Sequence, residues 1–289
     1  MNPERIIPIT PIMGRYRQLR TMSQHDRLRQ AKHLVKHPEE LATEFAASIA
    51  HFEPYKNIAD HFYPPRLDPK ISEDVKCTND LVLRLKAQPT VVPVDSPTRR
   101  REHEAGPVVT AVPASRLACD YVDRELLVQR TTSPGEWEDG TRNRGGLRLD
   151  VLLADAADRT PIVGELKLPG DMDPFFALIQ GLACAAHLAT ANQYDRMQKH
   201  LGRGEFPDLP GAPRVDVWVL TVDGPAHDPK GSQPKYMGDL KAAAERLAPK
   251  LLAEDSIAAS LRRIAGVGMK LDDSGAVAAD VRWAWERTG

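Results

Sequence analysis

The sequence has few cysteines, no long apolar run and almost no net charge. Its cysteines, Cys77, Cys119 and Cys184, are odd in number and widely separated. They fit free thiols in a reducing cytoplasm better than a disulfide framework or a zinc site. No apolar run approaches the roughly 18–20 residues of a membrane span, and the first residues lack a signal-peptide pattern. We therefore expect a cytoplasmic protein with no membrane partner.

The formal net charge of −1 excludes polyanion binding through overall charge alone. Positive charge is nevertheless concentrated in two places. Residues 14–37 contain one acid, Asp26, and the basic residues Arg15, Arg17, Arg20, Arg27, Arg29, Lys32 and Lys36. A second cluster is Arg99, Arg100 and Arg101. Each cluster is either a phosphate-binding surface or a solvated face.

The order of predicted elements indicates an α/β protein preceded by a helical region. Residues 1–88 form the helical N-terminal region, with helices at Met22–His37, Glu39–Phe52 and Ser72–Ala87. Residues 89–113 are rich in proline and predict a linker or a long loop. Residues 114–289 form a second domain, an α/β sandwich with a mixed sheet. Its predicted helices are Ser115–Asp123, Asp173–Ala191, Met237–Leu252 and Ser256–Ala265, and its predicted strands are Leu126–Thr131, Gly146–Ala154, Pro161–Leu168, Arg214–Val222 and Val281–Trp285.

Two of these strands, Gly146–Ala154 and Pro161–Leu168, are joined by a short polar segment. A symmetric antiparallel hairpin places Asp150 opposite Glu165 and Arg148 opposite Lys167. Because side chains alternate along a strand, these four share one face. The other face, which we expect to be the core side, carries Leu147, Leu149, Val151, Leu153, Ile162, Gly164, Leu166 and Leu168.

Two carboxylates opposite each other in a hairpin repel, at a cost of about 0.2–1 kcal/mol. A divalent cation offsets that repulsion, and Mg²⁺ is commonly held by one or two carboxylates with water and phosphate oxygens. Such a metal polarises a phosphoryl group and activates a water molecule, while a nearby ammonium offsets the developing charge. Asp150, Glu165 and Lys167 therefore suit phosphodiester hydrolysis. The alternative is a surface ladder of salt bridges.

At these residues, Leu149-Asp150-Val151 and Glu165-Leu166-Lys167, the sequence resembles the PD-(D/E)XK nuclease superfamily. The resemblance implies a restriction-endonuclease-like sandwich with a mixed central sheet. It also implies that Asp150, Glu165 and the main-chain carbonyl of Leu166 bind Mg²⁺ or Mn²⁺, and that Lys167 positions the attacking water.

Further site residues are suggested by the same resemblance and by position. Gln180 matches a glutamine of the RecB-like branch, although Cys184 stands where that branch has tyrosine; its alternative role is a polar contact to the sheet. Glu125 is a candidate for a supporting acid at a helix-to-strand junction, or a solvated charge. Three arginines beside the first motif strand are candidates to bind nucleic acid, or belong to a solvated loop: Arg142, Arg144 and Arg148.

These observations predict a metal-dependent nuclease, with DNA favoured over RNA as substrate. By family analogy, bacterial antiviral defence or repair is the expected context. A further alternative is an enzyme that is silent alone and is activated by a partner helicase or ATPase, since the chain has no P-loop of its own. The helical region 1–88 suits a homo-oligomer interface as well as a DNA-binding surface. The alternative function is a non-catalytic nucleic-acid-binding or assembly module built on a nuclease fold.

Overall fold

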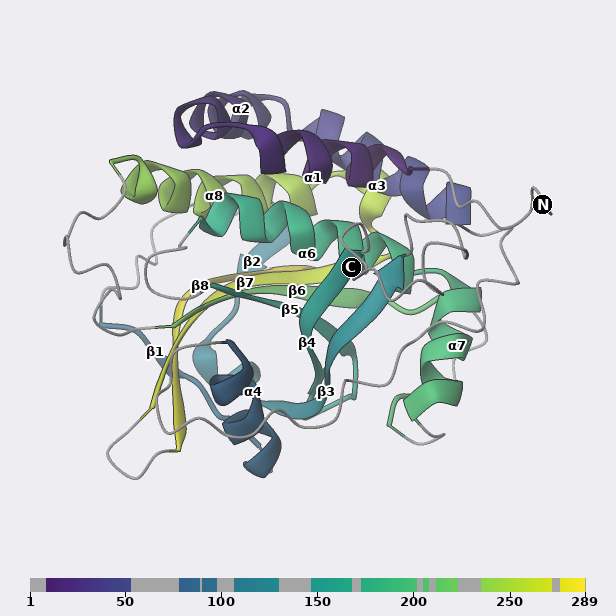
Figure 1. Ribbon diagram of the computed structural model, residues 1–289, viewed down its shortest axis with the longest axis vertical. Coiled ribbons are helices and arrows are strands. Elements are labelled where there is room, and N and C mark those ends of the chain that lie inside the picture. Colours follow the sequence, from purple (N-terminus) through teal and green to yellow (C-terminus); the bar gives the residue numbers. More distant parts are fainter. Residues whose placement is uncertain are drawn as a thin grey trace, which may run out of the picture.

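The computed structural model describes residues 9–52, 78–88, 90–97, 107–129, 147–167, 173–201, 205–207, 212–222, 235–271 and 276–288. The architecture is α/β, with helices on both faces of an eight-stranded mixed sheet (Figure 1). The strands are β1 (Val94–Asp95), β2 (Val109–Ala111), β3 (Cys119–Gln129), β4 (Leu147–Asp155), β5 (Pro161–Lys167), β6 (Val215–Val222), β7 (Leu261–Leu271) and β8 (Val277–Arg287). The helices are α1 (Pro11–Thr21), α2 (Gln24–Lys36), α3 (Pro38–Phe52), α4 (Thr78–Ala87), α6 (Pro174–Leu188), α7 (Ala191–Leu201) and α8 (Met237–Leu252), with short 3₁₀ turns η3 (Ala114–Arg116) and η4 (Asp255–Ile257).

The strand order along the sheet is β1-β8-β7-β6-β5-β4-β3, and β2 also pairs with β8. Strands β3, β4 and β5 form an antiparallel meander, whereas β5, β6 and β7 run parallel to one another. Every residue of β6 is buried. Its continuous apolar sequence is typical of a parallel strand that is covered on both faces.

Helices lie in two layers on one face of the sheet. Helices α6 and α8 contact the strands, and α1, α2 and α3 pack on top of them (Figure 1). Leu34 of α2, Leu182 of α6 and Val217 of β6 belong to one continuous hydrophobic cluster. On the opposite face Leu85 of α4 and Trp218 of β6 belong to a second cluster. The predicted helical region 1–88 is therefore divided between the two faces, and α1–α3 share their core with the sheet.

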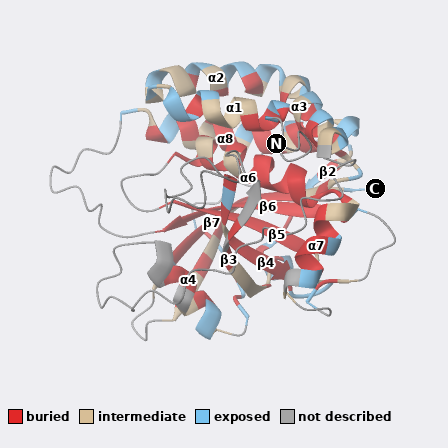
Figure 2. Ribbon diagram, turned by 45° about the vertical axis from the view of Figure 1, so that its right-hand side comes forward, coloured by how far each residue is buried: buried red, intermediate tan, exposed pale blue. Residues whose placement is uncertain are grey.

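Helix α6 is the most enclosed helix of this arrangement, with buried residues around its whole circumference (Figure 2). Its position explains its apolar sequence, because a helix that is hydrophobic on every side is one that is covered on every side. Asp173 caps its N-terminus by accepting a hydrogen bond from the backbone N–H of Phe176 at 2.9 Å, and Pro174 occupies its first turn. Gly181 lets the helix approach β6 closely: a Cβ there would lie 2.8 Å from Cγ1 of Val217.

Among the described residues, no single helix has both the length and the apolar character to cross a membrane, although α6 taken with Ala191–Lys199 passes on length and composition as a pair bent by 89°.

Two predicted helices are wrong. Ser115–Asp123 contains only the 3₁₀ turn η3 before β3 begins at Cys119, and Ser256–Ala265 contains η4 before β7 begins at Leu261. In the second case Ile257, Leu261 and Ile264 follow a helical spacing, but pairing with β6 and β8 decides the conformation. Tertiary pairing overrides a local pattern of this length.

The predicted linker at residues 89–113 also differs from the structure. Val94–Asp95 (β1) and Val109–Ala111 (β2) both pair with β8, at the edge of the sheet. Short edge strands of this kind tolerate flanking prolines because one side of their backbone needs no partner strand. Part of this proline-rich segment therefore belongs to the sheet.

Candidate active site

The hairpin formed by β4 and β5 has the register predicted from the sequence. Val151 lies opposite Gly164 and Ala154 lies opposite Pro161. The ladder of paired residues ends at Val151, so Asp150 is the next residue along β4. Instead of continuing the ladder, the Asp150 carboxylate accepts the backbone N–H of Leu166 through Oδ2 at 2.8 Å. This contact fixes Asp150 against the segment of β5 that carries Glu165 and Lys167.

The apolar face of the hairpin is buried as expected, but the face that carries Asp150, Glu165 and Lys167 is largely buried as well. Glu165 has no exposed surface and Lys167 is 8% exposed, whereas Asp150 is half-buried. Helices cover both faces of the sheet, so residues of both alternating sets are buried in β4 and β5. Glu165 lies against α6: a Cβ added to Gly181 of that helix would be 4.0 Å from the Cβ of Glu165.

Burial gives the Glu165 carboxylate unusual electrostatics. Lys167 Nζ donates to Glu165 Oε1 at 3.0 Å. Desolvation nevertheless raises the pKa of Glu165 well above its ordinary 4.5, and the charge of Asp150 raises the pKa further, against the opposing effect of Lys167. Two acids and one base share this pocket, so ionisation of both acids leaves an excess of negative charge, which the raised pKa of Glu165 reflects.

One oxygen of this group receives no hydrogen bond from a described donor. Glu165 Oε2 is buried and accepts no hydrogen bond from any described residue. A buried carboxylate oxygen without a donor is costly, at about 1–3 kcal/mol or more. Mg²⁺ and Mn²⁺ prefer such oxygen ligands and commonly take one or two carboxylates, with water and phosphate completing the shell. Asp150 and Glu165 fit that donor set, although the described residues contain no group of three or more His, Cys, Asp or Glu side chains arranged to hold a metal.

Gln180 lies on α6 beside the hairpin. It is half-buried, and its Nε2 donates to the main-chain oxygen of Arg148 at 3.4 Å. This is a contact to the sheet, and it ties α6 to the strand that carries Asp150.

Glu125 lies within β3 and not at the predicted helix-to-strand junction. Its neighbours Arg124 and Leu126 are paired with Val151 and Leu149, so its backbone is placed across from Asp150. The structure therefore brings a third acidic position to the same register level of the sheet.

The predicted nucleic-acid-binding arginines are only partly described. Arg148 is an exposed residue of β4, two positions before Asp150. Arg142 and Arg144 lie outside the described residues, as does Leu168 of the predicted strand. Leu166, whose carbonyl was the third predicted metal ligand, lies between Glu165 and Lys167 with its side chain in the cluster on the α4 face.

No family model, curated protein or solved structure matches the chain. The described architecture is an α/β fold with a mixed sheet and an N-terminal helical region. Functional assignment therefore depends on the geometry and electrostatics of the β4–β5 hairpin and of the helices above it.

Three residues that sequence reasoning left out of the site lie next to it. The ring of Tyr16 on α1 stacks on Phe176 of α6, with centroids 5.3 Å apart and planes 15° apart. Lys167 Nζ lies 5.8 Å from the centre of the same Phe176 ring. Burial, together with the charges of Glu165 and Asp150, raises the pKa of the Cys184 thiol well above its ordinary value. Nothing in the sequence indicates the position of Tyr16, because α1 is separated from the hairpin by more than a hundred residues.

Proposed function

We propose that the protein is a Mg²⁺- or Mn²⁺-dependent nuclease that hydrolyses phosphodiester bonds of nucleic acid, with DNA favoured as substrate. The observation that carries this proposal is the buried Glu165 carboxylate, which faces Asp150 and has one oxygen without a donor among the described residues. A purely structural ion pair would balance its charges, whereas ionisation of both acids here leaves one negative charge that Lys167 does not compensate. A divalent cation is the simplest group that removes the excess.

The order of elements supports the finer assignment to the PD-(D/E)XK fold. The meander β3-β4-β5 is followed by α6 and then by β6, which pairs parallel to β5. This is the order that the sequence resemblance implies for the strands and the helix after them. The helix expected before the meander is reduced to the single turn η3, which is a departure from that pattern.

In the proposed mechanism Asp150 and Glu165 would hold the metal through their carboxylate oxygens. When bound there, the metal would supply Lewis-acid activation of the phosphoryl group and of a water molecule. Lys167 orients the attacking water and offsets charge on the phosphorane-like transition state. Asp150 is kept in place by the Leu166 N–H, and Gln180 keeps α6 against the strand. The protein residues thus bind, orient and neutralise, which are the main requirements of phosphoryl transfer.

The test is a cleavage assay with single- and double-stranded DNA and RNA, in Mg²⁺ and in Mn²⁺. We expect Asp150→Ala, Glu165→Gln and Lys167→Ala each to lower the rate by about 100-fold or more. Lys199→Ala is the matched control, because Lys199 is an exposed lysine on α7 whose ion pair among the described residues is with Asp195. The proposal is rejected if the wild type cuts none of the substrates, or if the three variants cut as fast as the control.

Metal binding gives an independent test of the same site. Titration calorimetry with Mn²⁺ should show uptake by the wild type and a loss of at least 10-fold in affinity in Asp150→Asn. Equal uptake by both proteins would place the metal elsewhere and would favour a non-catalytic module.

A further inference from the structure

The basic residues of α1 and α2 separate into two groups in the structure. Arg15 is paired with Glu44 at 2.5 Å, Arg27 with Asp173 at 2.9 Å and Arg29 with Asp26 at 2.5 Å. These guanidinium groups are already neutralised. Four other cations have no ion pair to any described residue: Arg17 and Arg20 on α1, and Lys32 and Lys36 on α2.

Helix α1 is one of the outer-layer helices that reach the active site. It packs on α6, and its Tyr16 ring stacks on Phe176, beneath which Lys167 lies. Burial raises the pKa of Tyr16, which Arg20 and Lys167 lower and Glu165 raises further. The phenol therefore lies close enough to Glu165 and Lys167 to interact electrostatically with both side chains. Its hydroxyl makes no hydrogen bond with another described residue.

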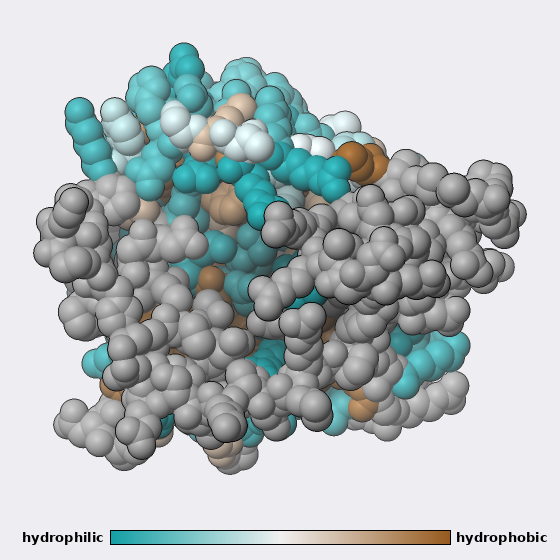
Figure 3. Space-filling view, in the orientation of Figure 1, coloured by the Kyte–Doolittle hydropathy of each residue, from teal (hydrophilic) through white to brown (hydrophobic). Residues whose placement is uncertain are grey.

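Arg20 lies one helical turn after Tyr16, on the same side of α1, because residues four apart are neighbours on a helix. Arg20 is exposed and Tyr16 is half-buried. The two side chains therefore lie in succession between solvent and the buried carboxylates. Hydrophilic residues also continue from the outer helices into the middle of this face of the molecule (Figure 3).

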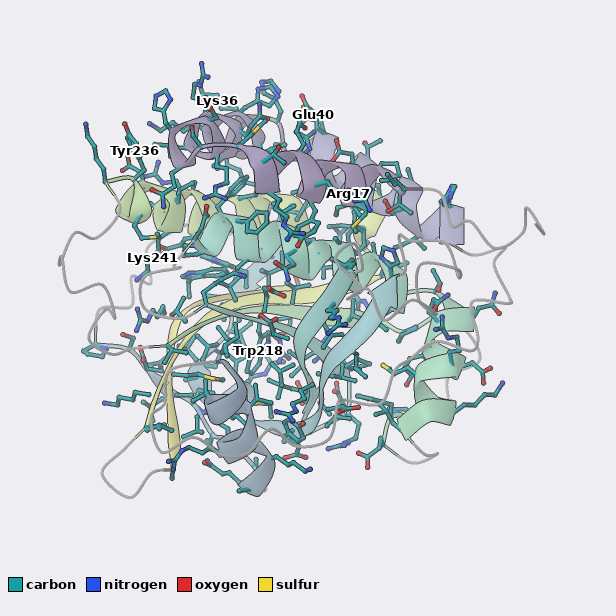
Figure 4. The ribbon with its side chains drawn as sticks, in the orientation of Figure 1. Arg17, Lys36, Glu40, Trp218, Tyr236 and Lys241 are labelled. Carbon is teal, nitrogen blue, oxygen red and sulfur yellow. The ribbon has the colours of Figure 1, made fainter. Side chains whose placement is uncertain are left out.

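The two cations of α1 and the two cations of α2 that lack an ion pair to a described residue lie at different distances from the site. Lys36 lies on the outer surface of the helix layer, whereas Arg17 lies lower, at the level where α1 meets α6 (Figure 4). Lys32 is an exposed residue of α2, and the residue of α2 that reaches α6 is Arg27, through Asp173 and the Phe176 ring. Of the four cations without an ion pair to a described residue, the α1 pair is therefore the better placed to act on a substrate that occupies the site.

We propose that α1 is the substrate-binding element of the active site, with Arg17 and Arg20 contacting backbone phosphates adjacent to the scissile phosphate and Tyr16 lying between them and the catalytic hairpin. This inference rests on the proposed nuclease function. Guanidinium groups bind phosphates through paired hydrogen bonds, and such backbone contacts position a nucleic acid without reading its sequence.

The experiment measures binding of fluorescent 20-mer DNA and RNA, single- and double-stranded, across a salt series. Asp150→Asn is used as the background so that the probe is not cut. The double change Arg17→Gln and Arg20→Gln should lower the slope of log affinity against log salt by about 1.4 for single strands or 1.8 for duplex, because each lost phosphate contact contributes about 0.7–0.9. The matched control is Lys32→Gln with Lys36→Gln, which removes the same charge from α2 and should change the slope by less than half as much.

The inference is overturned if the α2 control lowers the slope as much as the α1 pair, if the α1 pair leaves the slope unchanged, or if the background protein binds none of the probes. Thermal unfolding of each variant shows that the comparison is made on folded protein. Because this background cannot cut, failure of the salt effect counts against the role of α1, whereas absence of cleavage by the wild type counts against the nuclease proposal.

A kinetic readout separates substrate binding from disturbance of the site. In the cleaving protein, Arg20→Gln should raise KM at least 5-fold with kcat within 2-fold of the wild type, as expected when uniform binding is lost. A fall in kcat with unchanged KM would show that Arg20 acts on the catalytic groups, and would overturn the assignment to substrate phosphates.

Discussion

Replacing Asp150 by asparagine should make the metal-free protein more stable while abolishing its proposed activity. The substitution removes one of two negative charges and leaves the ion pair between Glu165 and Lys167, at 3.0 Å, in place. The amide oxygen of asparagine can still accept the N–H of Leu166, which now donates to Asp150 at 2.8 Å. Asp150→Asn therefore isolates the charge of Asp150 from its structural role.

The size of the effect follows from the charges. Two unit charges about 4 Å apart repel by about 4 kcal/mol at an effective dielectric constant of about 20. Loss of the attraction between Asp150 and Lys167 cancels most of this, so we expect a net gain of about 1–2 kcal/mol in the free energy of unfolding at a pH where Glu165 is ionised. The folded-state pKa of Glu165 is raised above 4.5, so its stabilising contribution is full below pH 4.5 and is lost as pH rises. The advantage of Asp150→Asn should therefore shrink towards pH 4.

Urea unfolding in EDTA and in saturating Mg²⁺ is the assay. Metal at 100 times its dissociation constant should stabilise the wild type by about 2.7 kcal/mol and leave Asp150→Asn nearly unchanged, which reverses the order of the two proteins. The reasoning is refuted if Asp150→Asn is the less stable protein in EDTA, or if Mg²⁺ stabilises both equally.

Three further predictions concern the scaffold. His187 is buried and its pKa is lowered to about 3 by burial, so it contributes stability above pH 6.5 that is lost as pH falls. The wild type should lose about 1.4 kcal/mol per pH unit between pH 6.5 and 5, and His187→Gln should reduce that slope; equal slopes would contradict this. Arg262 bridges three carboxylates, so Arg262→Met should lower the free energy of unfolding by about 3 kcal/mol. The control Lys199→Ala should lower it by less than about 0.5 kcal/mol. Similar losses for the two variants in urea unfolding would show that the network is not structural. Gly181→Val should lower the unfolding free energy by about 1–3 kcal/mol, because its Cβ would lie 2.8 Å from Val217; an unchanged unfolding midpoint would rule out the close approach.

The hairpin could be predicted because its determinants are local. The short segment between β4 and β5 fixes the register, and a shift of one residue would reverse every side chain. Asp150 was therefore placed correctly beside the Glu165 strand, and the observed pairing of Val151 with Gly164 confirms the register. The adjacent strand β6 could also be predicted from the sequence, since a continuous apolar run bounded by polar residues is typical of a buried parallel strand.

The surroundings of the hairpin could not be predicted, because they are made by distant parts of the chain. Glu165 is buried by α6 and by the helix layer above it, and no pattern in the sequence of the hairpin indicates that helices cover this face. Tyr16 follows the buried side of α1 with Ile12 and Leu19, so its sequence position predicts packing and not a place beside Lys167. The spacing in Ser256–Ala265 favours a helix as well as a strand, and only the neighbouring strands decide between them.

The enclosed position of α6 has a consequence for how this protein can evolve and be engineered. Its inner surface packs on the strands that carry the acids, and its outer surface packs on α1 and α3. Deleting the N-terminal helices would expose an apolar surface on α6 and loosen the hairpin beneath it. Under the proposal that α1 binds substrate, preference would not be exchanged by transplanting the first fifty residues as an independent cassette. It would change by substitutions at exposed positions of α1, with the shared core left intact.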